Sequence, residues 1–139
     1  EIVSLGTGAG TVDNVKPGGL VAIGTKLDPS LSRSDSLLGS VIGKPGTLPE
    51  NSTEAKLKIS LFDTAVGSQG ETKVTPVQAG ELLRVNIGTA PVPAKVNVVK
   101  ANEIEIGFRR PVCLFTGGSV ALSRRISERW RLVGAGVVV

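Results

Sequence analysis

Apolar and polar residues alternate one by one through much of this chain, and a period of two is the spacing of a β-strand. In "KLKISL" the alternation places Leu57, Ile59 and Leu61 on one face and lysine or serine on the other. The segments "LRVNI", "KVNVV" and "EIEIGF" repeat the pattern, and no segment has a convincing helical period. Glycine and proline separate these segments, as in "TAPVP" and "TGG", where turns are expected. Several short strands at this spacing predict an all-β barrel or sandwich.

The composition argues against several classes of function. The 139 residues include no histidine, so the commonest general base is missing, and a single cysteine cannot form a disulfide or supply a zinc site. We expect Cys113 to be a buried apolar side chain in a reducing compartment. No apolar run approaches the roughly 20 residues of a membrane span, and the first residues do not resemble a signal peptide. The sequence predicts a cytoplasmic protein without membrane contact and without a catalytic motif in this chain.

Two glycine-rich stretches match nucleotide-binding loops only in part. "GTGAGTV" has Thr11 where a dinucleotide-binding loop needs its third glycine, so a hairpin loop is the better interpretation. "GSVIGKPG" has three residues rather than four between Gly39 and Gly43, and Pro45 replaces the Ser or Thr that would bind magnesium. Neither stretch predicts a nucleotide site.

Positive charge is concentrated in the later part of the chain. The net charge is +4, with four bases and five acids in residues 1–50 and twelve bases and seven acids in residues 51–139. From residue 106 onward there are six arginines, no lysine and one acid. The planar guanidinium donates bidentate hydrogen bonds to phosphate. This pattern is compatible with phosphate binding. Pairing with backbone or exposure to solvent would account for the arginines equally well.

The stretch "VALSRRISERWRLVG" predicts two strands joined around residues 127–128. Because the turn has no Gly or Asn, we expect a loop wider than two residues. Strict alternation would place Arg124 on the same face as Val120 and Leu122. The strand is therefore expected to end, to bulge or to reach the barrel rim before Arg124.

A stretch rich in proline and glycine, residues 43–54, is the best candidate for a domain boundary. It predicts a small C-terminal barrel over residues 48–139. Residues 1–47 are short for an independent domain. We expect this N-terminal part to belong to a larger barrel whose beginning lies upstream of Glu1.

Several motifs occur in the order found in one protein family. They are "PGG" (17–19), "GTKLDP" (24–29), "RSD" (33–35), "GSVIG" (39–43), "VNIGT" (85–89) and "VALSRRISERWRLVGAG" (120–136). With these motifs the chain resembles the gamma subunit of eukaryotic and archaeal translation initiation factor 2. Broader relatives of that family, such as elongation factor Tu, have two β-barrels after a GTPase domain.

The resemblance implies an all-β fold of two β-barrels of the translational-GTPase type, the first incomplete in this chain. Residues 1–47 would be the C-terminal part of the second domain, and residues 48–139 would be the third. The full-length protein would be a GTPase that binds GTP and magnesium in an upstream domain. It would form a heterotrimer with alpha and beta subunits and carry initiator methionyl-tRNA to the small ribosomal subunit.

The same resemblance suggests an RNA-binding groove in "GTKLDPSLSRSD". Lys26 and Arg33 would contact terminal phosphates of the tRNA. Asp28 and Asp35 would fix a polar loop or a ribose hydroxyl. Ordinary turn chemistry of the Asp-Pro and Ser-Asp pairs is the alternative for these residues.

The arginines of the last hairpin are the second candidate site. The residues expected to face phosphate of tRNA or of small-subunit rRNA are Arg124, Arg125, Arg129 and Arg131. A contact with the GTPase domain is the alternative. Trp130 is expected either to stack beneath an arginine or to plug the barrel end.

Two other functions stay open. The first is an elongation-type factor, such as the selenocysteine-specific one, which has the same barrels. The second is a non-enzymatic protein-interaction module. Three stretches expected to be loops, at residues 6–15, 62–72 and 90–95, depart from the family pattern and weaken any contact assigned to them.

Overall fold

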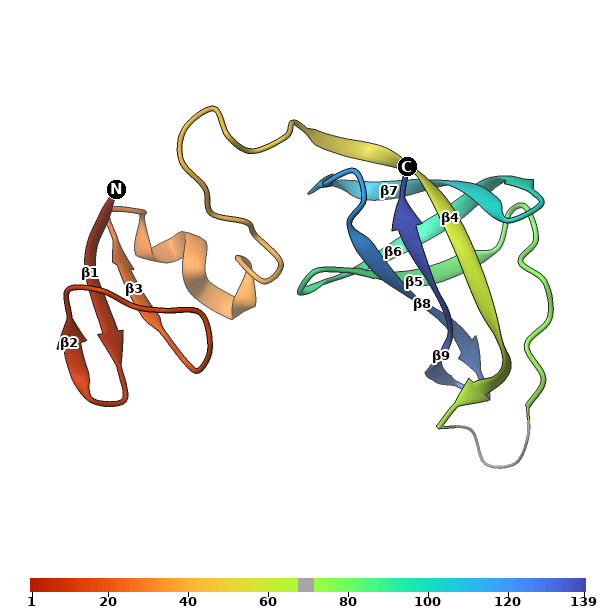
Figure 1. Ribbon diagram of the computed structural model, residues 1–139, viewed down its shortest axis with the longest axis horizontal. Helices are drawn as coiled ribbons and strands as arrows, with labels where there is room; N and C mark the ends of the chain where they lie inside the picture. The colour runs from red at the N-terminus through yellow and green to blue at the C-terminus, as the bar shows by residue number, and fades with distance from the viewer. Residues whose placement is uncertain (68–71) are drawn as a thin grey trace. The chain divides into compact units, whose positions relative to one another are not determined.

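The computed structural model describes residues 1–67 and 72–139 (Figure 1). It divides into two compact units, Glu1–Leu37 and Leu38–Val139. The strands are β1 (Ile2–Thr7), β2 (Gly10–Val12), β3 (Ala22–Thr25), β4 (Asn51–Val66), β5 (Leu82–Ile87), β6 (Ala90–Lys100), β7 (Glu103–Cys113), β8 (Ser119–Ile126) and β9 (Arg129–Val138), and one 3₁₀ segment, η1, covers Pro29–Asp35. Within the described ranges there is no helix with the length and apolarity needed to cross a bilayer.

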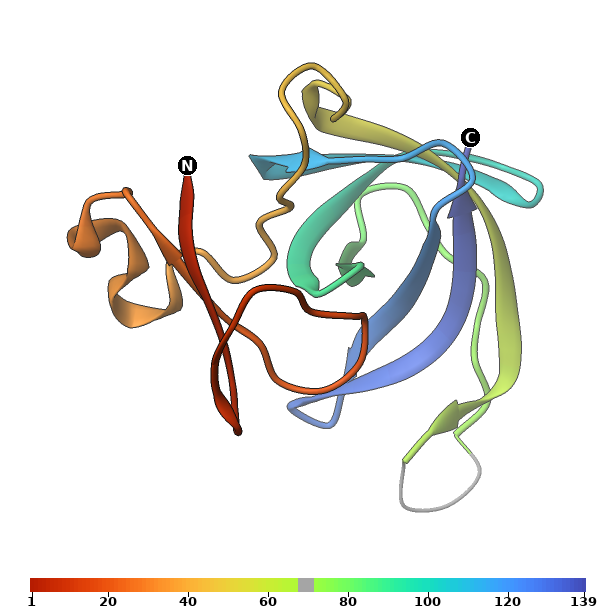
Figure 2. The same ribbon diagram turned by 60° about the vertical axis from the view of Figure 1, so that its left-hand side comes forward.

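The second unit is a closed barrel in the order β4-β7-β6-β5-β8-β9, and antiparallel pairing of β4 with β9 completes the ring (Figure 2). The prediction of an all-β barrel is confirmed. The inner faces supply the core, whose largest fully buried side chains are Leu57, Leu83, Ile104, Ile106, Leu122, Val85, Val96 and Val133. These residues occupy alternate positions on their strands, as the period of two predicted. Cys113, expected to be buried, is only half-buried at the end of β7.

The loop expected at residues 90–95 is instead the first half of β6. Pro91 lies opposite Asn86, and Pro93 lies opposite Arg84 on β5. The register of β6 with its other neighbour, β7, begins only at Ala94. Proline has no N–H to donate, so a strand tolerates it where only one neighbour needs hydrogen bonds. Because of the two prolines the sequence did not indicate this strand, whose first half pairs only with β5 and whose second half pairs also with β7.

The prediction of a loop at residues 62–72 was also wrong for its first part, because β4 continues to Val66. Residues 68–71 of that stretch lie outside the described residues. Between the pairs Leu61↔Gly134 and Val66↔Leu132, the register of β4 shifts against β9. A bulge interrupts the alternation of side chains, so this part of the strand has no period of two to reveal it.

The first unit is a three-stranded sheet in the order β2-β1-β3. Thr7 lies opposite Gly10, so the hairpin expected at "GTGAGTV", within the stretch 6–15, is present. No residue of this unit is buried. The predicted boundary after residue 47 falls between Thr25 and Asn51, where there is no strand. The assignment of the two units to domains of a longer protein stays a prediction.

Close approach of β4 and β9 gives a test of the barrel. A Cβ on Gly134 would lie 2.5 Å from the carbonyl oxygen of Ser60. We expect Gly134→Ala to lower the free energy of unfolding by about 1–3 kcal/mol, because the clashing atom is backbone and cannot rotate away. Urea unfolding followed by circular dichroism measures this, with the exposed neighbour Ala135→Ser as control. Equal midpoints for the two variants would contradict the close β4–β9 pairing.

Candidate functional site

The β8–β9 hairpin carries its arginines on two different faces. Residues opposite each other in an antiparallel pair share a face of the sheet. Arg124 lies opposite Arg131, whereas Arg125 lies opposite Trp130. Arg124 continues the inner face of β8 after the buried Leu122. The predicted cluster is therefore divided by the pleat, with Arg125 on the outer face and Arg124 and Arg131 on the face at the barrel end.

A bulge on β9 produces this division. Leu122 lies opposite Gly134 but Ser123 lies opposite Leu132, so Val133 is the extra residue. The bulge expected on β8 before Arg124 is not present, because the extra residue lies on the partner strand and Arg124 stays on the face of Val120 and Leu122. Between Val133 and the turn, the extra residue reverses which face each β9 side chain takes relative to β8. Without it Arg131 would lie opposite Arg125.

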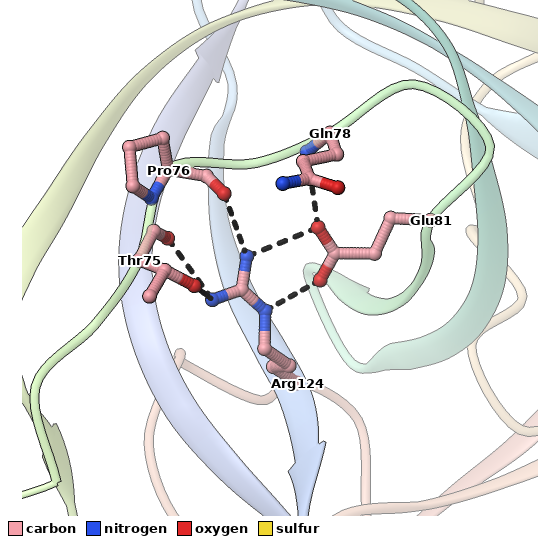
Figure 3. Close-up of polar contacts among 5 residues, drawn as sticks. All are labelled: Thr75, Pro76, Gln78, Glu81 and Arg124. Atoms are coloured by element: carbon pink, nitrogen blue, oxygen red, sulfur yellow. Dashed lines mark hydrogen bonds and ion pairs between the residues drawn. The ribbon is translucent and has the colours of Figure 1, made fainter.

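The guanidinium of Arg124 is held by five hydrogen bonds (Figure 3). Nε and Nη2 donate to the two carboxylate oxygens of Glu81, the Nη2 bond being 3.0 Å long. Nη1 donates to the carbonyl oxygen and the hydroxyl oxygen of Thr75, both at 3.0 Å. Nη2 also donates to the carbonyl oxygen of Pro76 at 3.4 Å. These bonds match the five N–H donors of a guanidinium.

The acceptor carboxylate is in turn fixed to its own segment. The backbone N–H of Gln78 donates to Oε2 of Glu81 at 3.1 Å. The side chains of Arg124 and Glu81 are only 16% and 21% exposed. A bidentate pair so shielded is stronger than an exposed one. We call Arg124, Glu81, Thr75, Pro76 and Gln78 the clamp.

The clamp fastens the segment 75–81 across one end of the barrel. Val77 of this segment is buried in the core. Gly80 donates its N–H to the carbonyl of Val96 at 2.7 Å, and Val96 donates to the carbonyl of Glu81 at 2.9 Å. The segment and Arg124 line an open depression of about 390 Å³. Because the guanidinium donors are already used, the depression offers no free cation to a ligand.

Because its donors are bonded within the chain, Arg124 is not available to phosphate in this conformation. Its role in the structure is to hold the chain together. Arg125 pairs with Glu128, at side-chain exposures of 59% and 84%, and so exposed a pair contributes little and opens readily. Arg129 is exposed and Arg131 half-buried. Phosphate binding by these three arginines stays a prediction.

Trp130 does not plug the barrel end. The residue is 41% exposed, and its register opposite Arg125 places it on the outer face. The β9 bulge is the cause, since it determines which face each β9 residue between Val133 and the turn takes.

The turn at Ser127 and Glu128 is tighter than expected. Ile126 lies opposite Arg129, so only two residues connect the strands. Their φ values are 47° and 66°, the positive values that a type I′ turn requires at both central positions. The right-handed twist of the strands selects this turn even though neither residue is Gly or Asn, so the expected wider loop was wrong.

The candidate groove in the first unit is held by local contacts. Nζ of Lys26 lies 2.7 Å from Oε2 of Glu1, and both side chains are exposed. Oδ1 of Asp28 accepts the backbone N–H of Ser30 at 2.8 Å and caps η1. This hydrogen bond from the Ser30 backbone, with help from its side chain, lowers the pKa of the Asp28 carboxyl. Turn chemistry is thus observed for Asp28, and an RNA contact stays a prediction.

Arg33 and Asp35 lie in an irregular piece of backbone. Ser34 and Asp35 have φ values of 55° and 56°, and the regular η1 geometry breaks at Arg33 and Ser34. Positive φ at consecutive residues with side chains is uncommon and typical of functional loops. The contact of Arg33 and Asp35 with RNA stays a prediction.

Three residues of interest escaped the sequence analysis. Glu81 is separated from its partner by 43 positions, and no spacing rule links the two. Arg84 and Lys95 occupy outward positions of the strands predicted from "LRVNI" and "KVNVV". The alternation of "LRVNI" already places Arg84 on the outer face, and the same rule places Lys95 there, but neither was expected to bind.

The segment around Gly39 does not fit a GTP phosphate. A phosphate-binding loop needs a helix directly after its lysine, and no helix follows Lys44 in the described chain. Nor do three or more Asp, Glu, Cys or His side chains gather as a metal site among the residues searched, which are the described ones.

Comparison with known proteins gives a consistent result. A family model described as "Initiation factor eIF2 gamma, C terminal" matches residues 53–138. The chain is 42% identical to the translation initiation factor 2 subunit gamma of Methanococcus vannielii, over 100% of this chain and 34% of that protein. The same subunit is 45% identical in Pyrococcus furiosus (99% and 34%) and 46% in Aeropyrum pernix (99% and 33%). The chain spans about a third of the length of these curated relatives.

The clamp is expected to stabilise the fold as a unit. Glu81→Gln should lower the free energy of unfolding by about 2 kcal/mol, because it leaves a shielded guanidinium without its counter-charge. Combined with Arg124→Met it should cost less than the sum of the two single changes. Denaturant titrations of the cycle measure the coupling, and Arg125→Met, from the exposed pair, should change stability by less than about 0.5 kcal/mol. Additive effects would contradict the clamp.

The tight turn makes an independent prediction. Ser127→Asn combined with Glu128→Gly should raise the free energy of unfolding by about 1 kcal/mol, because both residues favour positive φ. Glu128→Gln is the control, since it removes the ion pair with Arg125 and leaves the backbone preference unchanged. A double variant no more stable than the control in thermal unfolding would speak against the two-residue turn.

Proposed function

This chain belongs to the family described as "Initiation factor eIF2 gamma, C terminal", and we propose that it helps to deliver initiator methionyl-tRNA to the small ribosomal subunit in a GTP-dependent complex. The resemblance inferred from the sequence motifs is confirmed by identities of 42–46% to gamma subunits along the chain. This similarity is the observation that carries the proposal. An elongation-type function is less favoured, because these relatives are named as initiation-factor subunits.

The proposal assigns GTP and magnesium to a part of the protein outside these residues. The segment Gly39–Pro45 lacks the spacing and the helix of a phosphate-binding loop. The relatives are about three times as long as this chain, which leaves room for a GTPase domain. In this proposal the alpha and beta subunits are partners in a cytoplasmic heterotrimer.

The first unit supports the idea that further protein covers it. None of its residues is buried, and Leu20 is 92% exposed. Apolar side chains left in water are typical of surfaces that another segment or subunit covers. We interpret the unit as the later part of a second barrel.

Three arginines of the hairpin are the proposed RNA contacts in the barrel. Arg125, Arg129 and Arg131 lie within seven positions of one another around a two-residue turn, Arg125 on the outer face and the other two on the opposite face. Of these three arginines, only Arg125 has an ion-pair partner in the described part of the chain. An anionic partner would offset their mutual repulsion, and its affinity would depend on salt.

Charge reversal tests this proposal. We expect Arg125→Glu with Arg129→Glu to weaken binding to initiator methionyl-tRNA or to small-subunit rRNA. The slope of log affinity against log salt should become shallower by roughly 1.4–1.8, the value for two lost phosphate contacts. Fluorescence anisotropy at several salt concentrations gives both quantities.

The control is Lys58→Glu with Lys100→Glu, which changes the net charge equally at positions flanking Glu103. An equal loss of affinity in both double variants would mean that net charge alone matters. Unchanged affinity and slope in the hairpin variant would refute the assignment. Tight binding of an alpha subunit with no RNA binding at low salt would favour a protein-interaction module.

A further inference from the structure

Outward side chains continue from the hairpin across the outer face of four strands, and they are exposed except for the half-buried Arg84. Trp130 on β9 lies opposite Arg125 on β8. On the next strand, β5, Arg84 lies opposite Ser123 of β8. Two positions further along these strands, Leu82 and Arg125 follow on the same face, since side chains repeat their direction every second residue. The hairpin and β5 thus share one outer surface.

The surface extends to β6. Leu82 lies opposite Lys95, and the neighbours of these residues in sequence, Leu83 and Ala94, are buried in the core. Alternation therefore turns Leu82 and Lys95 outward. Leu82 is 66% exposed. We call Trp130, Arg125, Leu82, Arg84 and Lys95 the basic strip.

The cations of the basic strip are spaced regularly. Leu82 lies between Arg125 and Lys95 in one row across the strands, and Arg84 is the diagonal neighbour of each cation, at roughly 7–8 Å in such a register. Among the described residues neither Arg84 nor Lys95 takes part in an ion pair. Beyond Lys95 the row reaches Gly107 and then Glu54, where a carboxylate ends the positive surface.

We propose that the basic strip binds the sugar–phosphate backbone of RNA, with Arg84 and Lys95 as phosphate-binding residues and Trp130 as a stacking platform for a base. The inference rests on the proposed function and extends its contact surface beyond the hairpin. A guanidinium donates a fork of hydrogen bonds to phosphate. An exposed indole beside arginine can stack with unpaired bases.

The chain contains a single tryptophan, so its fluorescence reports on this surface alone. We expect initiator tRNA to quench the emission of Trp130 as it binds. Arg84→Glu with Lys95→Glu should lower RNA affinity at least tenfold at 0.1 M salt and make the salt slope shallower by roughly 1.4–1.8. Lys58→Glu with Lys100→Glu, which has the same net charge, should stay within twofold of the wild type.

The failures of the two proposals are distinguishable. Loss of binding in the Arg125/Arg129 variant but not in the Arg84/Lys95 variant would overturn the basic strip and leave the proposed function intact. A wild-type chain that binds neither RNA at low salt would overturn both. If the strip variant lost binding to polyglutamate while keeping RNA affinity, the strip would be a protein-docking surface and the inference would be wrong.

A folding control completes the experiment. Circular dichroism compares the thermal midpoints of all variants. If the charge-reversed strip variant unfolded, Arg84→Gln with Lys95→Gln would replace it. That pair should show about half the loss of net charge and the same change in salt slope, and a slope equal to that of the wild type would overturn the inference.

Discussion

The ion pair of Arg124 with Glu81 makes an arginine-rich hairpin compatible with a closed barrel. Arg124 and Arg131 lie directly opposite each other on one face, and like charges in that position destabilise a sheet. Glu81 supplies the opposing charge, and the oxygens of Thr75 and Pro76 use the remaining donors. The pair also fastens the segment that covers one end of the core. One side chain thus keeps a charged hairpin and a barrel end together.

The pleat of the strands then determines which charges can reach a partner. The buried inward positions, such as Leu83 and Val133, carry apolar side chains, so outward positions are where binding residues can accumulate without cost to the core. The β9 bulge at Val133 refines this rule for β9, because it places Trp130 on the outer face opposite Arg125 and Arg131 at the barrel end opposite Arg124. A change of one residue in register is thus enough to separate Arg131 from Arg125, which would otherwise lie opposite each other on one face.

Much of the barrel was predictable because alternation encodes it directly. The alternation of "KLKISL" and "EIEIGF" predicts inward positions for Leu57, Ile104 and Ile106, and all three are buried. What escaped depended on distant parts of the chain. Pro91 and Pro93 are compatible with a strand only because β7 does not pair with that half of β6, and local composition does not reveal this.

The candidate site was predictable as a region and not residue by residue. Sequence motifs identified the family and the arginine-rich hairpin. They could not indicate that Glu81 would remove Arg124 from the set, or that strand twist would impose a two-residue turn on Ser127 and Glu128. Both results come from tertiary contacts and strand geometry, which override local preference.

The most direct test of this account is the NMR spectrum of the arginine Nε–H groups during titration with initiator tRNA. The Nε–H of Arg124 donates to Glu81 inside the chain, so we predict a resonance that exchanges slowly with solvent and does not shift on RNA addition. The resonances of Arg84 and Arg125 should shift together at the same RNA concentration. A shift of the Arg124 resonance with loss of its protection, while those of Arg84 and Arg125 stay unchanged, would contradict the division between structural and RNA-facing arginines.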